Sequence, residues 1–176
     1  MGDFNGTILT NRGRNLLAKA QTGVQLNFTR IGLGDGVWPQ GTDPATLIAL
    51  VNEKKSLAIQ SLQVTGDGTS RLRFLLTNAG LTEGFFIREI GIFANDPDLG
   101  EILYAVTYAS DKADYIPAAG VTLIENVTDI FTVVSNTQNV TARISDTVVL
   151  ATKKDIQEHN ESTGSHQDIR TSLTNH

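Results

Sequence analysis

Three acidic residues that lie close together in the sequence could bind a calcium ion. Asp96, Asp98 and Glu101 have an i, i+2, i+5 spacing, at which carboxylate oxygens can converge on a hard cation. The pattern of a complete calcium loop is missing, and Pro97 and Gly100 in the same segment are typical of a simple turn. We therefore expect a turn here, without a bound metal.

The three histidines lie close to the C-terminal end and have the chemistry to ligate a transition metal. They are His159, His166 and His176, and a neutral imidazole is a good ligand for zinc, nickel or iron. In an assembly of three chains, one histidine near the axis would occur three times and could form a site between chains. We favour the simpler interpretation, in which they lie at linker turns. No G-x-S-x-G motif accompanies them, so they do not indicate a catalytic triad.

A single acidic residue, Glu89, interrupts the apolar segment from Phe85 to Ala94. Catalysis by paired carboxylates would need a second acid beside it, and the sequence does not place one. Because a buried carboxylate needs a partner, we interpret Glu89 as a structural residue bound to Arg88, Arg73 or a backbone N–H group. The phenylalanines of this segment could stack on a ligand, but aromatic residues in strands more often belong to a core.

The glycine-rich sequence from Gly32 to Gly36 could let backbone N–H groups approach a phosphate. A dinucleotide site would need a helix directly after it, and Trp38-Pro39 follows instead, so we interpret the segment as a tight corner. Trp38 stands alone in a loop, where it could contact a partner protein or fold back onto its own core. We name it as the candidate partner contact. We predict no catalytic, cofactor-binding or metal-binding residue, and no enzyme activity.

The composition of the 176-residue chain excludes several classes of protein. Hydrophobic residues make up 40% and charged residues only 19%, which is typical of a β-rich domain with a weakly charged surface. The net charge is −5 and no basic block is present, which argues against binding of nucleic acid through its phosphates. No apolar run approaches the roughly 20 residues of a membrane helix, so we expect no membrane insertion. The absence of cysteine excludes disulfides, thiolate metal sites and cysteine nucleophiles.

A helix is predicted near the N-terminus by a capping residue, an apolar face and a closing glycine. Thr10 is a suitable N-cap, because its hydroxyl can accept a hydrogen bond from a free N–H group of the first turn. Leu16, Leu17 and Ala20 share one face of this helix. Gly23 follows at the position where a left-handed residue commonly ends a helix.

A second, short helix is predicted in the loop after the glycine corner. Asp43 precedes Pro44, which suits the first helical position because an N–H group is not needed there. Leu47, Ile48 and Val51 would then form the buried face of this helix.

Alternating apolar residues predict strands over most of the remaining sequence. A phase change between Leu57–Ile59 and Leu62–Val64 indicates a bulge or bend, and Asp67-Gly68 is a typical hairpin turn. A second hairpin is expected around the turn from Asn95 to Gly100, and a third around Asn136 to Asn139.

Together these elements predict an α+β fold. The N-terminal helix is expected to pack on a mostly antiparallel β-sheet or sandwich of about seven strands. The composition changes near Thr147, after which polar residues dominate. We therefore predict one domain over residues 1–147, followed over residues 148–176 by the start of a short helical or linker stalk.

The predicted stalk contains three large aliphatic residues, Ile156, Ile169 and Leu173. They are too sparse to bury a core within one chain, but around a three-fold axis each would form a layer of three that can exclude water. We therefore predict a homotrimer in which these residues associate. Gly164 argues against one continuous coiled coil, so we expect short helical pieces joined by a turn.

Four segments of the chain occur in a recognisable order. The first two are Ile8 to Gly23, with its helix, and Leu26 to Gly36, with its strand and glycine corner. The third is Phe85 to Ala94, with an internal Arg-Glu-Ile-Gly, and the fourth is the histidine-flanked stretch from His159 to Arg170. In this order they resemble the N-terminal domain of phage tail-collar and tail-fibre proteins, and the matches span most of the chain.

This resemblance implies a structural virion protein rather than an enzyme. Its domain would anchor the receptor-binding fibre of a contractile tail, from a phage or a phage-tail-like bacteriocin, to the tail baseplate. The implied partners are further copies of the chain and a baseplate wedge or fibre-attachment protein. The implied place of synthesis is the cytoplasm of the bacterial host, and no cofactor is implied.

Two other functions are compatible with the residues. A carbohydrate-binding module for host surface glycans would need exposed aromatic side chains on loops, for which Trp38, Tyr108 and Tyr115 are the candidates. A hydrolase acting on cell-wall polysaccharide would need two acidic residues facing one cleft, and no motif indicates such a pair.

Overall fold

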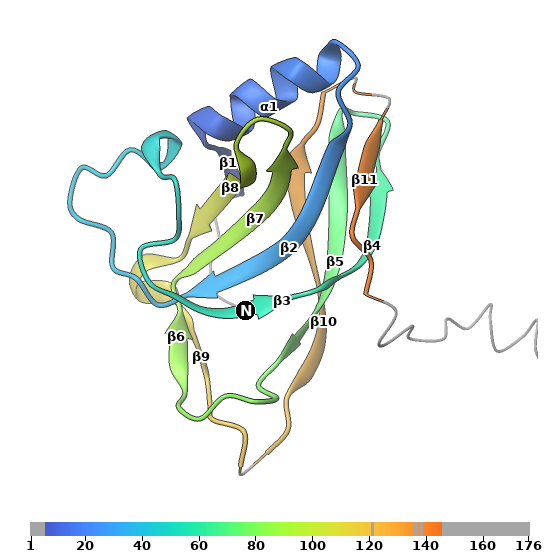
Figure 1. The fold of residues 1–176 in the computed structure, drawn as a ribbon. Helices are drawn as coiled ribbons and strands as arrows, with labels where there is room; N and C mark the ends of the chain where they lie inside the picture. Colours follow the sequence, from blue (N-terminus) through green and yellow to red (C-terminus); the bar gives the residue numbers. More distant parts are fainter. Residues whose placement is uncertain (1–5, 121, 136, 138, 146–176) are drawn as a thin grey trace, which may run out of the picture. The chain divides into compact units, whose positions relative to one another are not determined.

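The computed structural model describes residues 6–145 except 121, 136 and 138 (Figure 1). Contacts divide the chain into residues 1–145 and residues 146–176. The predicted stalk, its three aliphatic residues and the three histidines therefore lie outside the described residues. In the described part, no helix is long and apolar enough to cross a membrane.

Strands account for most of the regular structure. The elements in chain order are β1 (Ile8–Leu9), α1 (Asn11–Gln21), β2 (Leu26–Gly34), the 3-10 turn η1 (Pro44–Thr46), β3 (Glu53–Leu57), β4 (Ile59–Val64), β5 (Thr69–Thr77), β6 (Phe85–Ile87), β7 (Glu89–Asp96), β8 (Gly100–Tyr108), the 3-10 turn η2 (Ser110–Lys112), β9 (Asp114–Ile116), β10 (Glu125–Val133) and β11 (Val140–Ala142).

The predicted α+β class is wrong, because the fold is mainly β. Strands hold 49% of the described residues and helices 12%, and α1 has only 11 residues. In an α+β fold a layer of helices covers a sheet. Here the buried core joins residues of two sheets instead, and a single short helix adds to the same core.

The strands form two main sheets and one small one. The larger, six-stranded sheet has the order β1-β8-β7-β2-β11, and β3 also pairs with β2. The smaller sheet has the order β10-β5-β4, and β6 pairs with β9 in a separate two-stranded sheet. Among these strand pairs, β2 and β11 are parallel and the others are antiparallel.

The hydrophobic core lies between the two main sheets. Phe28 and Tyr104 of the larger sheet are fully buried, and their rings meet edge to face with centroids 5.2 Å apart. Leu72 and Phe74 of the smaller sheet belong to the same buried cluster. The phenol of Tyr104 donates to the carbonyl of Val133 at 2.7 Å, so even its polar end joins the larger sheet to β10.

Helix α1 begins, faces the core and ends as predicted. The Thr10 hydroxyl accepts from Gly13 N at 2.9 Å and donates to the carbonyl of Leu103 at 2.5 Å, which joins the helix start to β8. The predicted apolar face is buried: Leu16, Leu17 and Ala20. Gly13 lies so close to β8 that a Cβ there would be 2.0 Å from the carbonyl oxygen of Tyr104. Helix α1 therefore packs directly on the strand backbone (Figure 1).

The first two predicted hairpins and the predicted bend are confirmed. β4 pairs with β5 and β7 pairs with β8, each across its predicted turn. In the first turn, hydrogen bonds from the Thr65 and Thr69 hydroxyls and from Thr69 N lower the pKa of Asp67 to about 2. The predicted bulge lies in β4, where the register with β5 shifts between Ile59 and Ser61. Just before it, at Ala58, the chain leaves the larger sheet at the end of β3 and enters the smaller sheet as β4.

The third predicted hairpin is wrong. β10 pairs with β5, whereas β11 lies parallel to β2 in the other sheet. The backbone N–H groups of Val134 and Ser135 both donate to the carbonyl of Gly68 at 2.8 Å. These bonds hold the end of β10 against the β4–β5 turn. The next strand, β11, then joins the larger sheet instead of pairing with β10.

Candidate functional site

The most developed feature of the domain is the connection between β2 and β3, which we call the anchored loop and define as residues 35–52. A connection of this length with little regular structure is uncommon, and such loops are usually either functional or disordered. In this protein the loop is tied to the sheet at both of its ends by one buried side chain. Because both ends of the loop are fixed, we interpret it as a functional loop rather than a disordered one.

Glu89, the first residue of β7, is the anchor of this loop. Its side chain is fully buried, and each carboxylate oxygen accepts two hydrogen bonds. Oε1 accepts from the indole Nε1 of Trp38 at 2.7 Å and from Val51 N at 2.9 Å. Oε2 accepts from Asn52 N at 3.1 Å and from Gly36 N at 3.2 Å. Two donors thus come from each limb of the loop, so one carboxylate joins the limbs to each other and to the sheet.

The carboxylate of Glu89 is held by dipoles rather than by a counter-ion. Among the described residues, no lysine or arginine forms an ion pair with it. The predicted backbone donors are confirmed, whereas the two predicted arginines bind elsewhere. Arg73 pairs with Asp129 at 2.8 Å, and Arg88 donates to the carbonyl of Asp35 at 3.3 Å.

The glycine corner is shaped to receive this carboxylate. A Cβ on Gly34 or on Gly36 would lie 2.5 Å from Oε2 of Glu89. The interpretation of the segment as a corner is therefore correct. The glycines allow the backbone to lie directly against the buried carboxylate of Glu89. The backbone register also places Gly34 opposite Glu89, so the glycine corner and the Arg-Glu-Ile-Gly segment meet in space.

Trp38 packs on its own domain. Its indole stacks on the ring of Tyr108 with centroids 4.4 Å apart and an interplanar angle of 6°. Its backbone N–H donates to the Tyr108 hydroxyl at 3.1 Å. One face of Trp38 and its N–H group are thus engaged within the chain, and its predicted contact with a partner stays a prediction.

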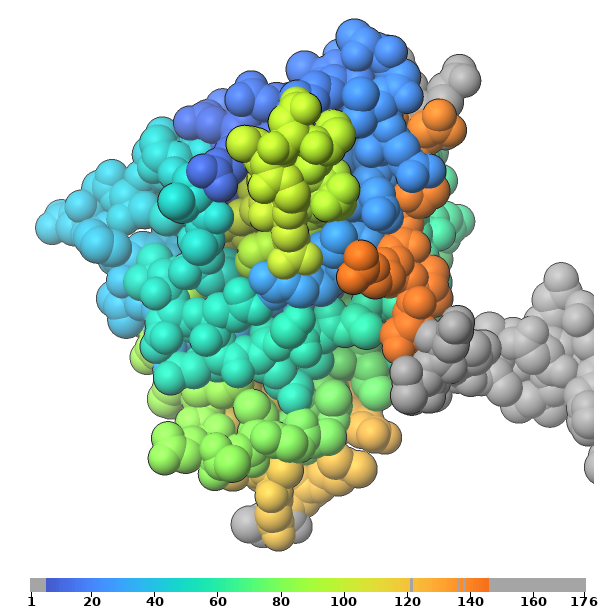
Figure 2. All heavy atoms as spheres, in the orientation of Figure 1, coloured from blue at the N-terminus to red at the C-terminus, as the bar shows by residue number. Residues whose placement is uncertain are grey.

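The anchored loop covers the outer face of the larger sheet and leaves aliphatic side chains in solvent. Beneath it, a second buried cluster comprises Leu50, Phe93, Leu103 and Val106, with Trp38 and Leu47 packed against it. On its outer surface, Val37 is 66% exposed, Ile48 is 61% exposed and Val51 is 48% exposed. Figure 2 shows the loop projecting at the left of the molecule.

The helix predicted in this loop forms only as the short 3-10 turn η1, which begins at Pro44 as predicted. The carboxylate of Asp43 caps this turn by accepting from Ala45 N at 3.0 Å. Ile48 and Val51, which were predicted to be buried, are exposed, whereas Leu47 packs against the buried cluster. Further along the loop, the N–H groups of Val51 and Asn52 donate to Glu89 rather than to helical carbonyls. Sequence reasoning missed these two partners because a backbone amide has no signature in the side-chain pattern.

The acidic residues of the β7–β8 turn bind side chains of the protein rather than assembling as a metal site. Lys19 contacts Asp96 at 2.9 Å and Asp98 at 2.7 Å, and Arg30 contacts Glu101 at 2.8 Å. Burial by itself would raise the pKa of Asp96, but hydrogen bonds from Lys19 and from two backbone N–H groups outweigh it and lower that pKa. Among the described residues, no group of three potential metal-ligating side chains is found.

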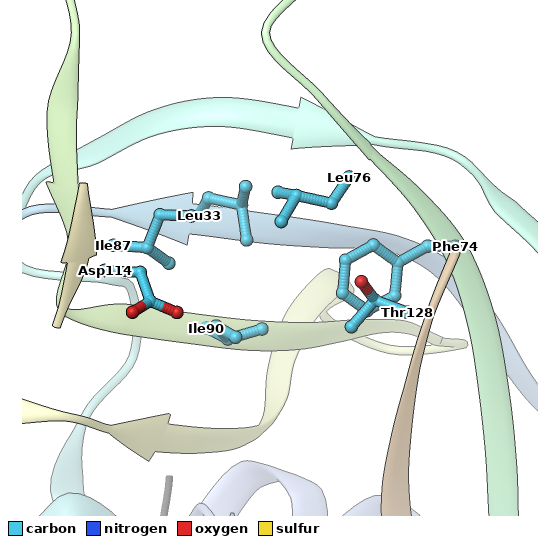
Figure 3. Close-up of a pocket in the computed structure, with 7 residues that line it drawn as sticks. All are labelled: Leu33, Phe74, Leu76, Ile87, Ile90, Asp114 and Thr128. Atoms are coloured by element: carbon cyan, nitrogen blue, oxygen red, sulfur yellow. The ribbon is translucent and has the colours of Figure 1, made fainter. Parts of the chain in front are cut away.

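The described part also contains a small apolar cavity between the sheets (Figure 3). Its lining is Leu33, Phe74, Leu76, Ile87, Ile90, Asp114 and Thr128. Aliphatic and aromatic side chains dominate this lining, and the carboxylate of Asp114 stands at one end of it (Figure 3). The cavity presents no arrangement of polar groups that would orient a substrate.

The aromatic residues that a glycan-binding module would use fall into two separate pairs. Trp38 stacks on Tyr108, whereas Tyr115 packs against Phe86 with centroids 5.1 Å apart. The structure therefore does not join the three candidate aromatics into one platform. Of the phenylalanines considered for stacking, Phe85 and Phe93 are buried and Phe86 is 46% exposed.

Comparison with known proteins identifies one family. The family of phage tail-collar fibre proteins, N-terminal part, matches residues 1–154. Both the glycine corner and the strand that carries Glu89 lie within the matched region. Neither the search of curated proteins nor the search of solved structures returned a match.

Proposed function

Since the chain belongs to the family of phage tail-collar fibre proteins, we propose that its N-terminal domain anchors a receptor-binding fibre to the tail baseplate. Membership of this family makes the chain a structural tail-fibre protein and a component of the virion. The observation that carries the proposal is the extent of the match, which covers the whole described domain. The structure adds support, because two of the segments that carry the resemblance, the glycine corner and the strand with Glu89, meet at Glu89 and fix one loop.

The proposal extends to the kind of particle and to its assembly. We assign the chain to a contractile tail, of a phage or of a phage-tail-like bacteriocin, made in the cytoplasm of the bacterial host. The partner of the domain is a baseplate wedge or fibre-attachment protein. The fibre is a homotrimer, in which Ile156, Ile169 and Leu173 contribute layers around the three-fold axis. A mass measurement of the full-length fibre that gave a stable monomer or dimer would contradict this oligomeric state.

The same proposal excludes a catalytic role for the domain. The most deeply buried acid, Glu89, is committed to four structural hydrogen bonds. We expect the purified chain to release no product from bacterial envelope polysaccharide, peptide or ester substrates. Turnover that disappeared on substitution of one acidic residue would overturn this expectation.

Anchoring is tested by removing the domain from a complete fibre. Particles are produced from genomes that encode the intact fibre, a fibre without residues 1–145, or no fibre. Electron microscopy and quantitative mass spectrometry then count the fibres on purified particles. We expect the truncated fibre to be synthesised but absent from particles. Particles that retain it at the normal level would show that another part of the fibre provides the attachment.

A further inference from the structure

We propose that the anchored loop, residues 35–52, is the surface through which this domain docks on the tail. It would insert exposed aliphatic side chains into an uncharged, apolar socket of a baseplate protein. This inference rests on the proposed function, since it names the surface by which the anchoring takes place. Four properties of the loop support it.

The first property is that the loop is held in one shape before any partner arrives. Glu89 binds both limbs, and Asn52 Nδ2 adds a 2.7 Å hydrogen bond to the carboxylate of Asp35 across the base of the loop. A surface that is already ordered loses less conformational entropy on binding than a flexible one. The sequence thus supplies a buried carboxylate and two close-packed glycines to fix a loop that carries no catalytic group.

The second property is the chemistry of its outer surface. From residue 36 to residue 52 the sequence contains one charged side chain, Asp43, whose carboxylate caps η1. Val37, Ile48 and Val51 are exposed on the two limbs. The cores of protein interfaces are depleted of charge, and the composition of this loop fits such a core. The partner is therefore expected to present apolar, uncharged surface.

The third property is that the charged residues flanking the loop are satisfied within the domain. Asp35 pairs with Lys54 at 3.7 Å, and Glu53 pairs with Arg30. Neither flank therefore offers an unpaired charge that would require an oppositely charged partner. The loop surface would bind by shape and burial of apolar area rather than by ion pairs.

The fourth property is the position of the loop relative to the edges of the larger sheet. This position favours a tail protein, rather than a second copy of the chain, as the binding partner of the loop. The turn η1 lies against β1, which is one edge strand of the larger sheet. The described chain ends just after β11, which is the opposite edge strand. Copies that associate through residues beyond 145 are thus connected at the edge away from η1, which leaves the loop free for a different protein.

The test places a charge on the loop in the complete fibre. Ile48→Asp is made in the phage or bacteriocin particle that encodes the chain, and the control is Leu123→Asp. The two positions are matched, because Ile48 is 61% exposed and Leu123 is 62% exposed. Thermal unfolding of both purified proteins checks that each is folded. We expect Ile48→Asp to lower the number of fibres per particle roughly tenfold, as for a central interface residue, while Leu123→Asp leaves it unchanged.

A photo-crosslinking amino acid at position 48, activated in purified particles, identifies the neighbour. Crosslinking to a baseplate protein would support the proposal, whereas crosslinking to another copy of this chain would overturn it. Normal fibre numbers on folded Ile48→Asp particles would also overturn it, and so would equal losses in both variants. If the unmodified chain itself were missing from purified particles, the proposed function would fail rather than the choice of surface.

Discussion

The backbone N–H of Gly36 donates to the side-chain carboxylate of Glu89 at 3.2 Å, and no side chain fits on the Cα of that glycine. A Cβ at Gly36 would lie 2.5 Å from Oε2 of Glu89 and 2.5 Å from the Cβ of Val51. This contact joins two of the four sequence segments that carry the family resemblance. It also sets the geometry from which the anchored loop projects.

Gly36→Ala should therefore destabilise the domain, although alanine differs from glycine by one methyl group. The added carbon would displace either the Glu89 carboxylate or Val51, and forced overpacking of this kind costs about 1–3 kcal/mol. Gly66→Ala is the control, because no atom lies within 4 Å of the Cβ position there. Urea unfolding should show the loss for Gly36→Ala and little change for Gly66→Ala. Equal stabilities of the two variants would contradict the close packing at the corner.

Glu89→Gln should loosen the anchored loop without removing any carbon atom. The amide NH₂ would face N–H donors in place of an accepting oxygen, and a buried donor left without a partner costs about 1–3 kcal/mol. Trp38 is the single tryptophan, so its fluorescence reports on the loop, and we expect its emission to shift to longer wavelength. Hydrogen exchange should accelerate at Gly36, Val51 and Asn52. The exposed Glu125→Gln serves as the control, and unchanged emission in Glu89→Gln would refute the anchoring role.

In Gly13→Ala, helix propensity and packing against β8 should have opposite effects on the stability of the protein. Alanine is the better helix former by about 1 kcal/mol, so propensity alone predicts a more stable protein. Because the added Cβ would lie 2.0 Å from the carbonyl oxygen of Tyr104, we expect a net loss of stability instead. Asn15→Ala, at an exposed position of the same helix, should be neutral or slightly stabilising. A stabilised Gly13→Ala variant would mean that the helix does not lie on β8 as described.

Asp96 should make part of the stability depend on pH. The pKa of its carboxyl is lower in the folded protein than in the unfolded chain, because hydrogen bonds from Lys19 and from the N–H groups of Asp98 and Leu99 outweigh burial. A depressed folded pKa gives stability that is present above the unfolded value of about 4 and is lost as the pH falls through the folded value. Asp96→Asn should cost about 1–3 kcal/mol at pH 7.

The difference between the unmodified protein and Asp96→Asn should then shrink as the pH is lowered below about 4. Urea unfolding at neutral and acidic pH measures this convergence. Asp98→Asn is the control, because the side chain of Asp98 is 73% exposed and its replacement should change stability by less than about 0.5 kcal/mol. A difference that stayed constant with pH would show that Asp96 titrates normally in the folded state.

The parts of this fold that sequence reasoning predicted are the ones decided by near neighbours. The Thr10 cap, the Asp67-Gly68 turn and the bulge in β4 each depend on residues a few positions apart. The pairing of β11 with β2 joins residues that are far apart in the sequence, so no local pattern indicates it.

The site was predictable to the same partial extent. Glu89 attracted attention as the one acid in an apolar strand, and a backbone donor was among its expected partners. The identity of those donors depends on how the loop returns to the sheet. Ile48 and Val51 have the spacing of a buried helical face, yet the loop exposes them, because the helical turn stops at Thr46 and the N–H of Val51 donates to Glu89.

The attachment of β11 has a mechanical consequence for the domain. β11 is held by its parallel ladder with β2, by a 2.8 Å bond from Arg143 N to the carbonyl of Phe28, and by a 3.1 Å bond from Ser145 N to the carbonyl of Ile59. Since ladder bonds run across the strands, tension along β11 stretches all of them at once in shear. A sideways force would instead peel them apart one after another, so the domain resists axial tension better than lateral tearing.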